Sequence, residues 1–211
     1  MIKAIFWDND GVLVDTEKLY YRANKEIFAK MGIDLTKELY IEFFLKKALG
    51  TWHIAEAKGY SKGQIDSYHV ERDELYSFLL STEMSVIKGA EETLHKLCGK
   101  FKMGIVTSSK RNHFELIHKR SDLLKYFDFV LASGDYAKSK PAPDPYLKAV
   151  ELSGFTKEEC IAVEDSERGL LAAKNAGIRC YVIPTELTKY SNFNSADKIL
   201  GNISELPDLL I

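Results

Sequence analysis

The chain has 211 residues, and its 29 basic and 31 acidic side chains are mixed along the sequence. The hydrophobic content of 45% is that of a globular protein and excludes extended disorder. No basic block or acidic tail is present, which argues against a nucleic-acid partner. The length lies between those of one and two ordinary domains and suits one domain with a sizeable insertion.

The chain begins with an apolar run over residues 2–7 that only Lys3 interrupts. Such a run predicts a strand that is buried on both faces, as in a parallel sheet. After an acidic turn, apolar residues recur at a spacing of four between Thr16 and Lys30. This spacing fits one face of a helix, and Gly32 is placed to end that helix.

Three more helices are expected before any further strand: over 36–49, over 52–58, and from an N-cap at Ser61 to about Leu80. The sequence has no strand pattern between about residues 16 and 83. Residues 15–83 are therefore predicted to form a small, all-helical domain that is inserted after the first strand.

From Val86 onwards, strand and helix patterns alternate. Strands are predicted over 102–107, 127–131, 161–163, 180–183 and 198–200. Helices are predicted between them, over 89–97, 114–118, 145–152 and 166–175. Because strands that alternate with helices form parallel sheets, we predict an α/β, Rossmann-like core with helices on both faces of the sheet. This core domain would comprise residues 1–14 and 84–211.

The acidic turn after the first strand carries Asp8 and Asp10, followed by Gly11. Like charges are unfavourable at a partly desolvated strand end, and a divalent cation between them removes the penalty. Mg²⁺ prefers carboxylate and carbonyl oxygens and keeps water ligands that a phosphate can replace. Gly11 allows a sharp turn with its amides directed at an anion. Taken alone, the pattern is equally that of a strand followed by an Asp-rich turn.

Polar groups also follow other predicted strands, because Thr107 ends the strand over 102–107 and Glu164-Asp165 follow the one over 161–163. The carboxyl ends of parallel strands meet at one edge of a sheet, where ligands bind. Thr107 would there donate to a phosphoryl oxygen, and the two acids would form the far wall of a metal site. Taken singly, Thr107 is equally an ordinary strand residue, and Glu164-Asp165 a helix N-cap with a solvated acid beside it.

Lys140 begins a loop with prolines at three alternate positions, Pro141, Pro143 and Pro145. Prolines stiffen a loop, so they would hold the lysine in one place. A fixed positive charge there would offset the acidic cluster and stabilise phosphate oxygens. The alternative is a surface lysine in a rigid turn.

The five histidines show no metal-ligand spacing, so we expect them at the surface or in packing, and this argues against a histidine-based hydrolase. Aromatic residues of the helical domain are more often core than substrate wall. They are Tyr20, Tyr21, Phe43, Phe44 and Trp52.

The three cysteines, Cys98, Cys160 and Cys180, are scattered, and two lie in apolar, strand-like runs. We expect buried, reduced thiols and therefore a reducing compartment. Lys3 and Asp8 interrupt the N-terminal run where a signal peptide needs an apolar core, and no apolar run reaches transmembrane length. We expect a soluble, cytoplasmic protein without a membrane partner, as a monomer or a weak homodimer.

Taken in order, four motifs resemble those of haloacid dehalogenase (HAD) superfamily hydrolases that carry a small helical cap after the first motif. The motifs lie at 8–15 (DNDGVLVD), 106–109 (VTSS), 140–145 (KPAPDP) and 163–166 (VEDS). The resemblance covers the core domain. For the cap, it rests on position and helical pattern.

The resemblance implies a role for each matching catalytic residue. Asp8 would be the nucleophile that forms an aspartyl-phosphate. Asp10 would be the general acid for the leaving group and then the base for water. Thr107 and Lys140 would hold the transferring phosphoryl group, and Lys140 would also steady the nucleophile.

The resemblance also implies a Mg²⁺ cofactor. Asp8, Asp165 and the backbone carbonyl of Asp10 would bind the ion, and Glu164 would bind it directly or through water. By the same resemblance, members that cleave carbon–halogen or phosphonate bonds lack the second aspartate. The presence of Asp10 therefore favours a phosphatase acting on a small phosphorylated metabolite, with a sugar phosphate preferred.

The chain is also similar to β-phosphoglucomutases, which leaves a phosphomutase as an alternative. It shares Thr16 and Arg22 with them, but Tyr20 stands where that family usually has His, and its Gly-x-Ser-Arg segment is not evident around residues 50–53. A non-catalytic binding or regulatory protein on the same scaffold is a further alternative. The candidate substrate contacts are Thr16, Tyr20, Trp52, His53, Ser108, Ser109 and Lys110. Of these, Ser108 and Ser109 are equally turn or helix-cap residues.

Overall fold

The computed structural model describes residues 1–47 and 49–211. By its internal contacts the chain divides into two compact units. The sheet unit comprises Met1–Asp15 and Ser85–Ile211, and the helical unit comprises Thr16–Met84. Among the described residues, no helix is both long enough and apolar enough to cross a membrane.

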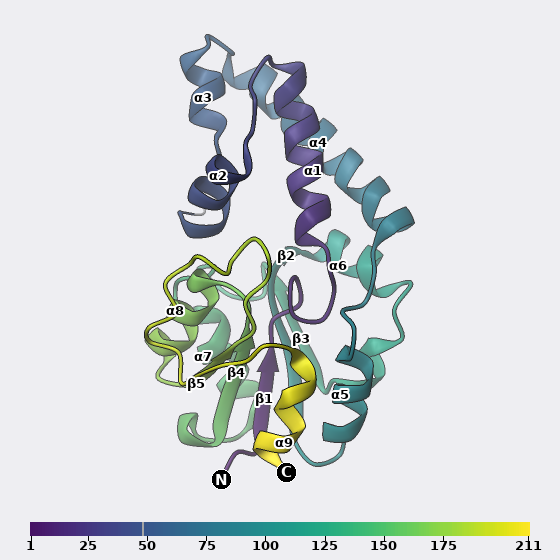
Figure 1. Ribbon diagram of the computed structural model, residues 1–211, viewed down its shortest axis with the longest axis vertical. Coiled ribbons are helices and arrows are strands. Elements are labelled where there is room, and N and C mark those ends of the chain that lie inside the picture. Colours follow the sequence, from purple (N-terminus) through teal and green to yellow (C-terminus); the bar gives the residue numbers. More distant parts are fainter. Residues whose placement is uncertain (48) are drawn as a thin grey trace. The chain divides into compact units, whose positions relative to one another are not determined.

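A six-stranded parallel sheet forms the centre of the sheet unit (Figure 1). Its strands are β1 (Ala4–Trp7), β2 (Lys102–Lys110), β3 (Phe129–Ser133), β4 (Cys160–Glu164), β5 (Arg179–Val182) and β6 (Lys198–Ile199). Their order across the sheet is β3-β2-β1-β4-β5-β6. The predicted fold class, a Rossmann-like parallel sheet with surrounding helices, is confirmed.

The order of the strands places β1 at the point where the chain changes direction across the sheet. The strands that follow β1 first add on one side, through β2 and β3, and then on the other, through β4 to β6. Every residue of β1 and β4 is buried, as their apolar runs predict for central strands covered on both faces. In open parallel sheets the crevice beside such a reversal is the usual ligand site. The carboxyl ends of β1, β2 and β4 are therefore the expected position of a ligand-binding or active site.

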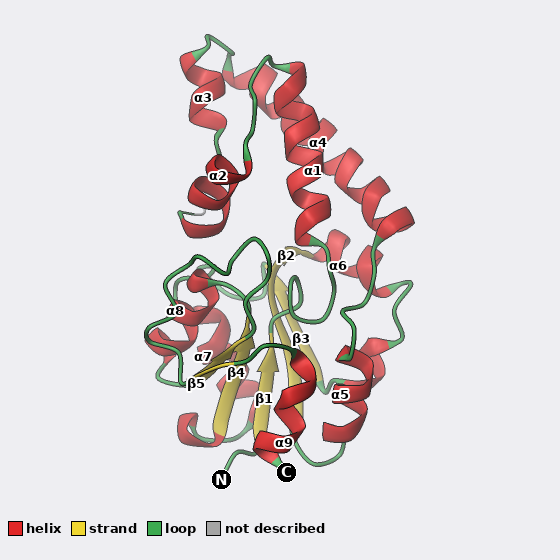
Figure 2. Ribbon diagram, viewed as in Figure 1, coloured by secondary structure: helices red, strands yellow, loops and turns green. Residues whose placement is uncertain are grey.

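Helices cover the sheet on both sides (Figure 2). They are α5 (Ala90–Leu97), α6 (Arg111–His118), α7 (Asp144–Ser153), α8 (Glu167–Ala176) and α9 (Leu206–Leu210), with short 3₁₀ turns η2 (Leu123–Tyr126), η3 (Lys157–Glu159) and η4 (Ile203–Glu205). Ser166 caps α8 by accepting a hydrogen bond from the Gly169 amide. Gly177 follows this helix and ends it in a left-handed conformation.

Several boundaries differ from the prediction. Strand β2 continues three residues beyond Thr107, because it pairs with β3 as far as Lys110 after a register shift. Ser108 and Ser109 therefore lie in the strand, not in a turn or cap. The 3₁₀ turns and α9 were not predicted, because such short elements have too few residues to show a hydrophobic period.

The helical unit contains α1 (Glu17–Lys30), α2 (Lys37–Tyr40), a π-helical segment η1 (Ile41–Lys46), α3 (Trp52–Ala57) and α4 (Lys62–Glu83). Helices α1 and α4 pack against each other. Ser61 forms the N-cap of α4 through a capping box with Gln64, as its position predicted. The prediction of a single helix over 36–49 is wrong, because the α-helix ends at Tyr40 and the π-helical segment η1 follows it. The ring of Tyr40 stacks on that of Phe44. Residue 48 lies outside the described residues.

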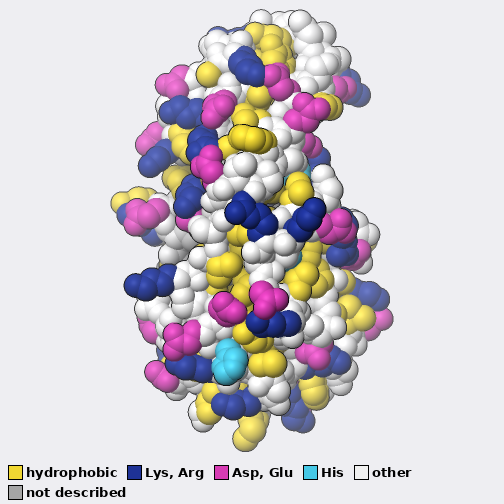
Figure 3. All heavy atoms as spheres, turned by 90° about the vertical axis from the view of Figure 1, so that its right-hand side faces the viewer, with side chains coloured by type: hydrophobic (Ala, Val, Ile, Leu, Met, Phe, Trp, Pro, Cys, Tyr) yellow, Lys and Arg dark blue, Asp and Glu magenta, His cyan; other side chains and the backbone are white. Residues whose placement is uncertain are grey.

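The cysteines are all free thiols. Cys160 and Cys180 are buried in central strands, as expected, whereas Cys98 is exposed, because it follows the last turn of α5. On the face drawn in Figure 3, basic and acidic side chains are interspersed, as their mixing along the sequence predicts.

Candidate active site

The carboxyl edge of the sheet gathers the predicted motifs of the sheet unit. Asp8 directly follows β1, Thr107 lies in the last part of β2, and Glu164 is the final residue of β4. Lys140 reaches the same edge from the loop after β3, where its ammonium donates to the carbonyl of Val106 at 2.8 Å. Residues that are far apart in sequence thus meet because parallel strands end at one edge.

Lys140 lies between two buried carboxylates. Its Nζ is 2.6 Å from Oδ1 of Asp8 and 2.6 Å from Oε1 of Glu164. The residues are 4%, 8% and 0% exposed, respectively, so water screens these charges very little. The lysine is therefore a fixed positive charge against the side of Asp8, as the proline-rich loop predicted.

The charges in this cluster do not balance. Burial raises the pKa of the Asp8 carboxyl to about 8, against the opposing effect of Lys140, and Glu164 and Asp10 raise it further. Burial disfavours the charge on Lys140, but Asp8 and Glu164 together keep the pKa of its ammonium above its usual value. One lysine cannot neutralise both partners, so full ionisation of Asp8 needs another positive charge.

Three carboxylates could hold such a charge. Ligand oxygens of Asp8, Glu164 and Asp165 lie within 4.8 Å of one another, and all three residues are buried. Gly11 makes the close approach possible, because a Cβ at this position would lie 2.4 Å from Oδ2 of Asp165 and its φ is +87°. Clustered, buried carboxylate oxygens suit a hard divalent cation such as Mg²⁺.

Asp10 faces a different environment from Asp8. Its Oδ2 accepts hydrogen bonds from Oγ of Ser109 at 2.7 Å, Oγ1 of Thr107 at 3.1 Å and Nδ2 of Asn9 at 3.3 Å. These donors are all neutral, whereas Asp8 is held by a lysine. The two carboxylates of one turn are thus positioned by separate sets of partners.

Glu164 has partners that the sequence did not reveal. The hydroxyl of Tyr146, in the first turn of α7, donates to Oε1 of Glu164 at 2.5 Å. Gly169 leaves room for this carboxylate, because a Cβ there would lie 1.9 Å from Oε2. Tyr146 follows the proline-rich loop by one residue, but sequence alone does not indicate which acid its hydroxyl meets.

A second unpredicted group lies behind the acidic turn. The imidazole of His118, at the end of α6, contacts Oδ1 of Asn9 through Nε2 at 2.8 Å and the hydroxyl of Ser121 through Nδ1 at 2.7 Å. His118 is 5% exposed and Asn9 is fully buried. Histidines were expected only at the surface or in packing, and for His118 that expectation misses a polar contact beside the site.

Burial lowers the pKa of His118 to about 4, although nearby Asp10 acts in the opposite direction. An unfolded histidine binds its proton near pH 6.5, so the unfolded state gains protons first as the pH falls. The stability contributed by this group is complete above about pH 6.5 and is lost on acidification towards about pH 4. Between about pH 7.5 and pH 5, the loss should be about 2 kcal/mol in the free energy of unfolding.

The measurement is urea unfolding at the two pH values for wild type and His118→Gln. On acidification, the free energy of unfolding should fall by about 2 kcal/mol less in the variant than in wild type. His95→Gln provides the control, because His95 is an exposed residue of α5. Equal losses in wild type and His118→Gln would contradict a neutral, buried His118.

The remaining predicted contacts of the sheet unit differ in position. Ser109 reaches Asp10 directly. Ser108 is half-buried in β2, and Lys110 is the exposed last residue of that strand. The structure therefore brings Ser109 into the polar group around Asp10, and a substrate contact at Lys110 stays a prediction.

Two of the predicted contacts in the helical unit, Tyr20 and Trp52, have different partners. The hydroxyl of Tyr20 accepts a hydrogen bond from the buried guanidinium of Arg72, which also donates to Asn24. Trp52 packs on the ring of His69 at 3.9 Å. Their substrate-binding roles, together with those of Thr16, which is buried, and of His53, which is exposed, stay predictions.

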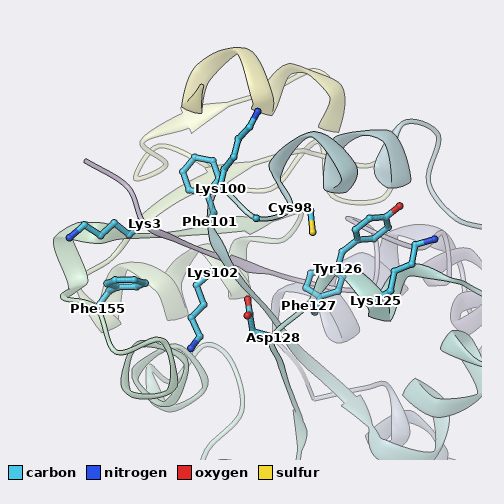
Figure 4. A pocket seen from close by; sticks show the side chains of 11 residues that line it. Lys3, Cys98, Lys100, Phe101, Lys102, Lys125, Tyr126, Phe127, Asp128 and Phe155 are labelled. Atoms are coloured by element: carbon cyan, nitrogen blue, oxygen red, sulfur yellow. The ribbon is translucent and has the colours of Figure 1, made fainter.

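A hollow of about 560 Å³ lies at the opposite edge of the sheet (Figure 4). Lys3, Lys102 and Asp128, which stand at or just before the starts of strands, line it together with Lys100 and Lys125. The ammonium groups of the four lysines point in different directions in Figure 4 and share no common centre. This hollow therefore lacks the convergent charges of the carboxyl edge.

Comparison with known proteins identifies the family. A family model described as haloacid dehalogenase-like hydrolase matches residues 5–183. Protein CbbY of Cereibacter sphaeroides is 31% identical over 222 residues, which cover 99% of this chain and 96% of that protein. The phosphorylated carbohydrates phosphatase of Thermotoga maritima is 32% identical over 183 residues, covering 84% of this chain and 82% of that protein.

Solved structures agree with these matches. A crystal structure of CbbY from Rhodobacter sphaeroides with phosphate has a TM-score of 0.81 at 29% identity, covering 98% of this chain and 96% of that one. A putative β-phosphoglucomutase from Thermotoga maritima has a TM-score of 0.79 at 26% identity, covering 99% and 98%. The chain is thus an enzyme of the hydrolase class. It belongs to the haloacid dehalogenase-like hydrolase family, and the resemblance predicted from its four motifs is confirmed.

Proposed function

We propose that the protein is a Mg²⁺-dependent phosphatase that hydrolyses a small phosphorylated metabolite, preferably a sugar phosphate, through an aspartyl-phosphate on Asp8. The observation that carries this proposal is the position of Asp8. It is a buried carboxylate, fixed on one side by Lys140 and grouped with Glu164 and Asp165. Hydroxyl donors of β2 hold the second acid of the same turn, Asp10.

Asp8, Asp165 and the backbone carbonyl of Asp10 would hold Mg²⁺, with Glu164 bound directly or through water. The donor set fits the ion, because its oxygens are close together and their charges exceed that of Lys140. When bound, the ion neutralises charge on phosphoryl oxygens and keeps Asp8 ionised. Glu164 also keeps Lys140 in place through their ion pair.

In the first step, an Asp8 carboxylate oxygen attacks phosphorus and the bond from phosphorus to the ester oxygen breaks. The proton of Asp10 passes to that oxygen, which leaves as an alcohol. Lys140 and Thr107 would stabilise the charge on the equatorial oxygens of the transferring group. A carboxylate nucleophile divides hydrolysis into two easier steps.

In the second step, water attacks the phosphorus of the aspartyl-phosphate. Asp10, now ionised, takes a proton from this water, and the bond to the Asp8 oxygen breaks to release inorganic phosphate. The Asp10 proton and the Asp8 carboxylate are thereby restored, so one water is consumed per turnover. Ser109 assists by keeping Asp10 in one orientation.

The names of relatives support the substrate class. One relative is a phosphorylated carbohydrates phosphatase, another is named hexitol phosphatase B, and a CbbY mutant was crystallised with xylulose 1,5-bisphosphate. All three names concern phosphorylated or reduced sugars. A panel of sugar and polyol phosphates is therefore the first choice of substrates.

The test is phosphate release from such a panel and from one aryl phosphate, with Mg²⁺ and after its removal by EDTA. We expect release only with the metal and a clear preference within the panel. Mg²⁺ should also stabilise the protein, by about 2.7 kcal/mol at a free concentration one hundred times its dissociation constant. The variant Asp165→Asn should reduce that stabilisation. Phosphate release that is unaffected by EDTA would contradict the proposed metal.

A phosphomutase is the second candidate, because a putative β-phosphoglucomutase shares the fold at 26% identity. A mutase returns phosphate to another hydroxyl of the same sugar, whereas a phosphatase gives inorganic phosphate. Product analysis on a hexose phosphate therefore separates the two. Tyr20 stands where β-phosphoglucomutases usually have a histidine, and its hydroxyl accepts a hydrogen bond from Arg72. This difference favours the phosphatase.

A further inference from the structure

A series of hydrogen-bonded polar side chains, with Asn9 and His118 buried and Ser121 and Asp10 half-buried, leads from the end of α6 to Asp10. Ser121 contacts Nδ1 of His118 at 2.7 Å, and Nε2 of His118 contacts Oδ1 of Asn9 at 2.8 Å. The side-chain amide of Asn9 then donates to Oδ2 of Asp10 at 3.3 Å. The mechanism proposed above uses neither Asn9 nor His118.

The direction of these hydrogen bonds follows from the groups at the two ends of the series, Ser121 and Asp10. Asp10 is an acceptor when ionised, so the Asn9 amide must present its NH₂ group to it and its oxygen to His118. A neutral imidazole that donates through Nε2 must accept through Nδ1, and the Ser121 hydroxyl is the donor there. Each donor thus points towards Asp10, and the sequence of bonds ends on its carboxylate.

Burying polar side chains such as those of Asn9 and His118 costs free energy, which hydrogen bonds offset only in part. Asn9 is fully buried between two acids, and His118 is 5% exposed. An apolar pair would fill the same space without two buried polar groups that require partners. Three donors, from Asn9, Thr107 and Ser109, instead converge on a single oxygen of Asp10 and fix the plane of its carboxylate.

We propose that Asn9 is a positioning residue for Asp10, and that His118 acts through Asn9 by holding its amide in the productive orientation. The proposal rests on the proposed function, because it assigns the pair to the proton transfer that Asp10 performs. It goes beyond the four motifs, since His118 lies outside all of them. A misaimed Asp10 protonates the leaving oxygen poorly while binding of the phosphate is retained.

The leaving group distinguishes this role from a general structural one. An alkyl alcohol leaves well only when it is protonated, whereas p-nitrophenol leaves readily as an anion. For Asn9→Leu we expect kcat/KM to fall about tenfold on glycerol phosphate and about twofold on p-nitrophenyl phosphate. His118→Leu should change the two esters in the same sense.

Two comparisons test whether His118 acts through Asn9. The double variant Asn9→Leu/His118→Leu should match Asn9→Leu to within about twofold on both esters. Thr93→Val is the structural control, because Thr93 is 1% exposed and donates to the Ile203 carbonyl, away from the site. This control should lose stability and leave the ratio of the two esters unchanged. An equal fall on both esters for Asn9→Leu, or fully multiplied losses in the double variant, would overturn the proposal.

A measurement without substrate separates this inference from the proposed function. In ¹H–¹⁵N spectra, the side-chain NH₂ signal of Asn9 should shift in Asp10→Ala and in His118→Leu, and the ¹⁵N shifts of His118 should report a neutral ring protonated at Nε2. If wild type released phosphate from no ester of the substrate panel, the proposed function would fail, and these spectra would still test the contacts of Asn9. An Asn9 signal that moves in neither variant would overturn the inference.

Discussion

Replacing Asp8 with asparagine is expected to reduce phosphate release by more than about a thousandfold. The amide is a poor nucleophile and cannot form the acyl phosphate, so both steps of hydrolysis are lost. The fold should remain intact, because the amide oxygen can still accept the hydrogen bond of Lys140 and a buried charge is removed. Urea unfolding and circular dichroism of the variant test that part.

The matched control is Asp128→Asn. Asp128 is an exposed aspartate at the opposite edge of the sheet, where it accepts a hydrogen bond from the Met103 amide. Its replacement should leave phosphate release unchanged. Residual activity of Asp8→Asn above about a thousandth of wild type would count against Asp8 as the nucleophile.

The sheet was predictable because its central strands carry unambiguous patterns. The apolar runs over 2–7 and 161–163 contain β1 and most of β4, and every residue of these two strands is buried. Once the alternation with helices indicates a parallel sheet, all strand ends fall on one edge. The meeting of Asp8, Lys140 and Glu164 follows from topology alone, although more than one hundred residues separate the first from the other two.

The contacts around this cluster were not predictable in the same way. The side chain of His118 meets Asn9, and that of Tyr146 meets Glu164. The directions of these two side chains depend on how α6 and α7 pack against the sheet. Periodicity says which face of a helix is buried, but not which polar group on that face meets another. Tertiary packing also extends β2 to Lys110, which brings Ser109 to Asp10.

The two acids of the first motif illustrate how environment separates roles. Asp8 lies among charged groups, one lysine and two carboxylates, so its ionisation depends on cations. Asp10 instead accepts hydrogen bonds from three neutral donors, Thr107, Ser109 and Asn9, which fix its orientation. This difference supports a nucleophile at the first position and an acid–base at the second.

Removal of the Lys140 charge should affect stability as well as activity. In Lys140→Met, Asp8 and Glu164 would lose the partner that contacts both at 2.6 Å and would remain buried. Breaking a buried ion pair in this way costs about 3–5 kcal/mol, because an uncompensated charge stays in the interior. Phosphate release should fall at least about a hundredfold, since the same lysine would stabilise the transferring group.

Two further variants identify the cause of the lost stability. Lys148→Met removes an exposed lysine of α7 that pairs with Glu151 and should change the free energy of unfolding by less than about 0.5 kcal/mol. Adding Glu164→Gln to Lys140→Met removes the buried charge that lacks a partner, so stability should recover in part while activity does not. A Lys140→Met protein as stable as Lys148→Met would show that the buried carboxylates do not depend on this lysine. Partial recovery of stability in the double variant would instead show that Lys140 acts as the counter-charge of Glu164 in the folded core, a role separate from the one proposed at the transferring phosphoryl group.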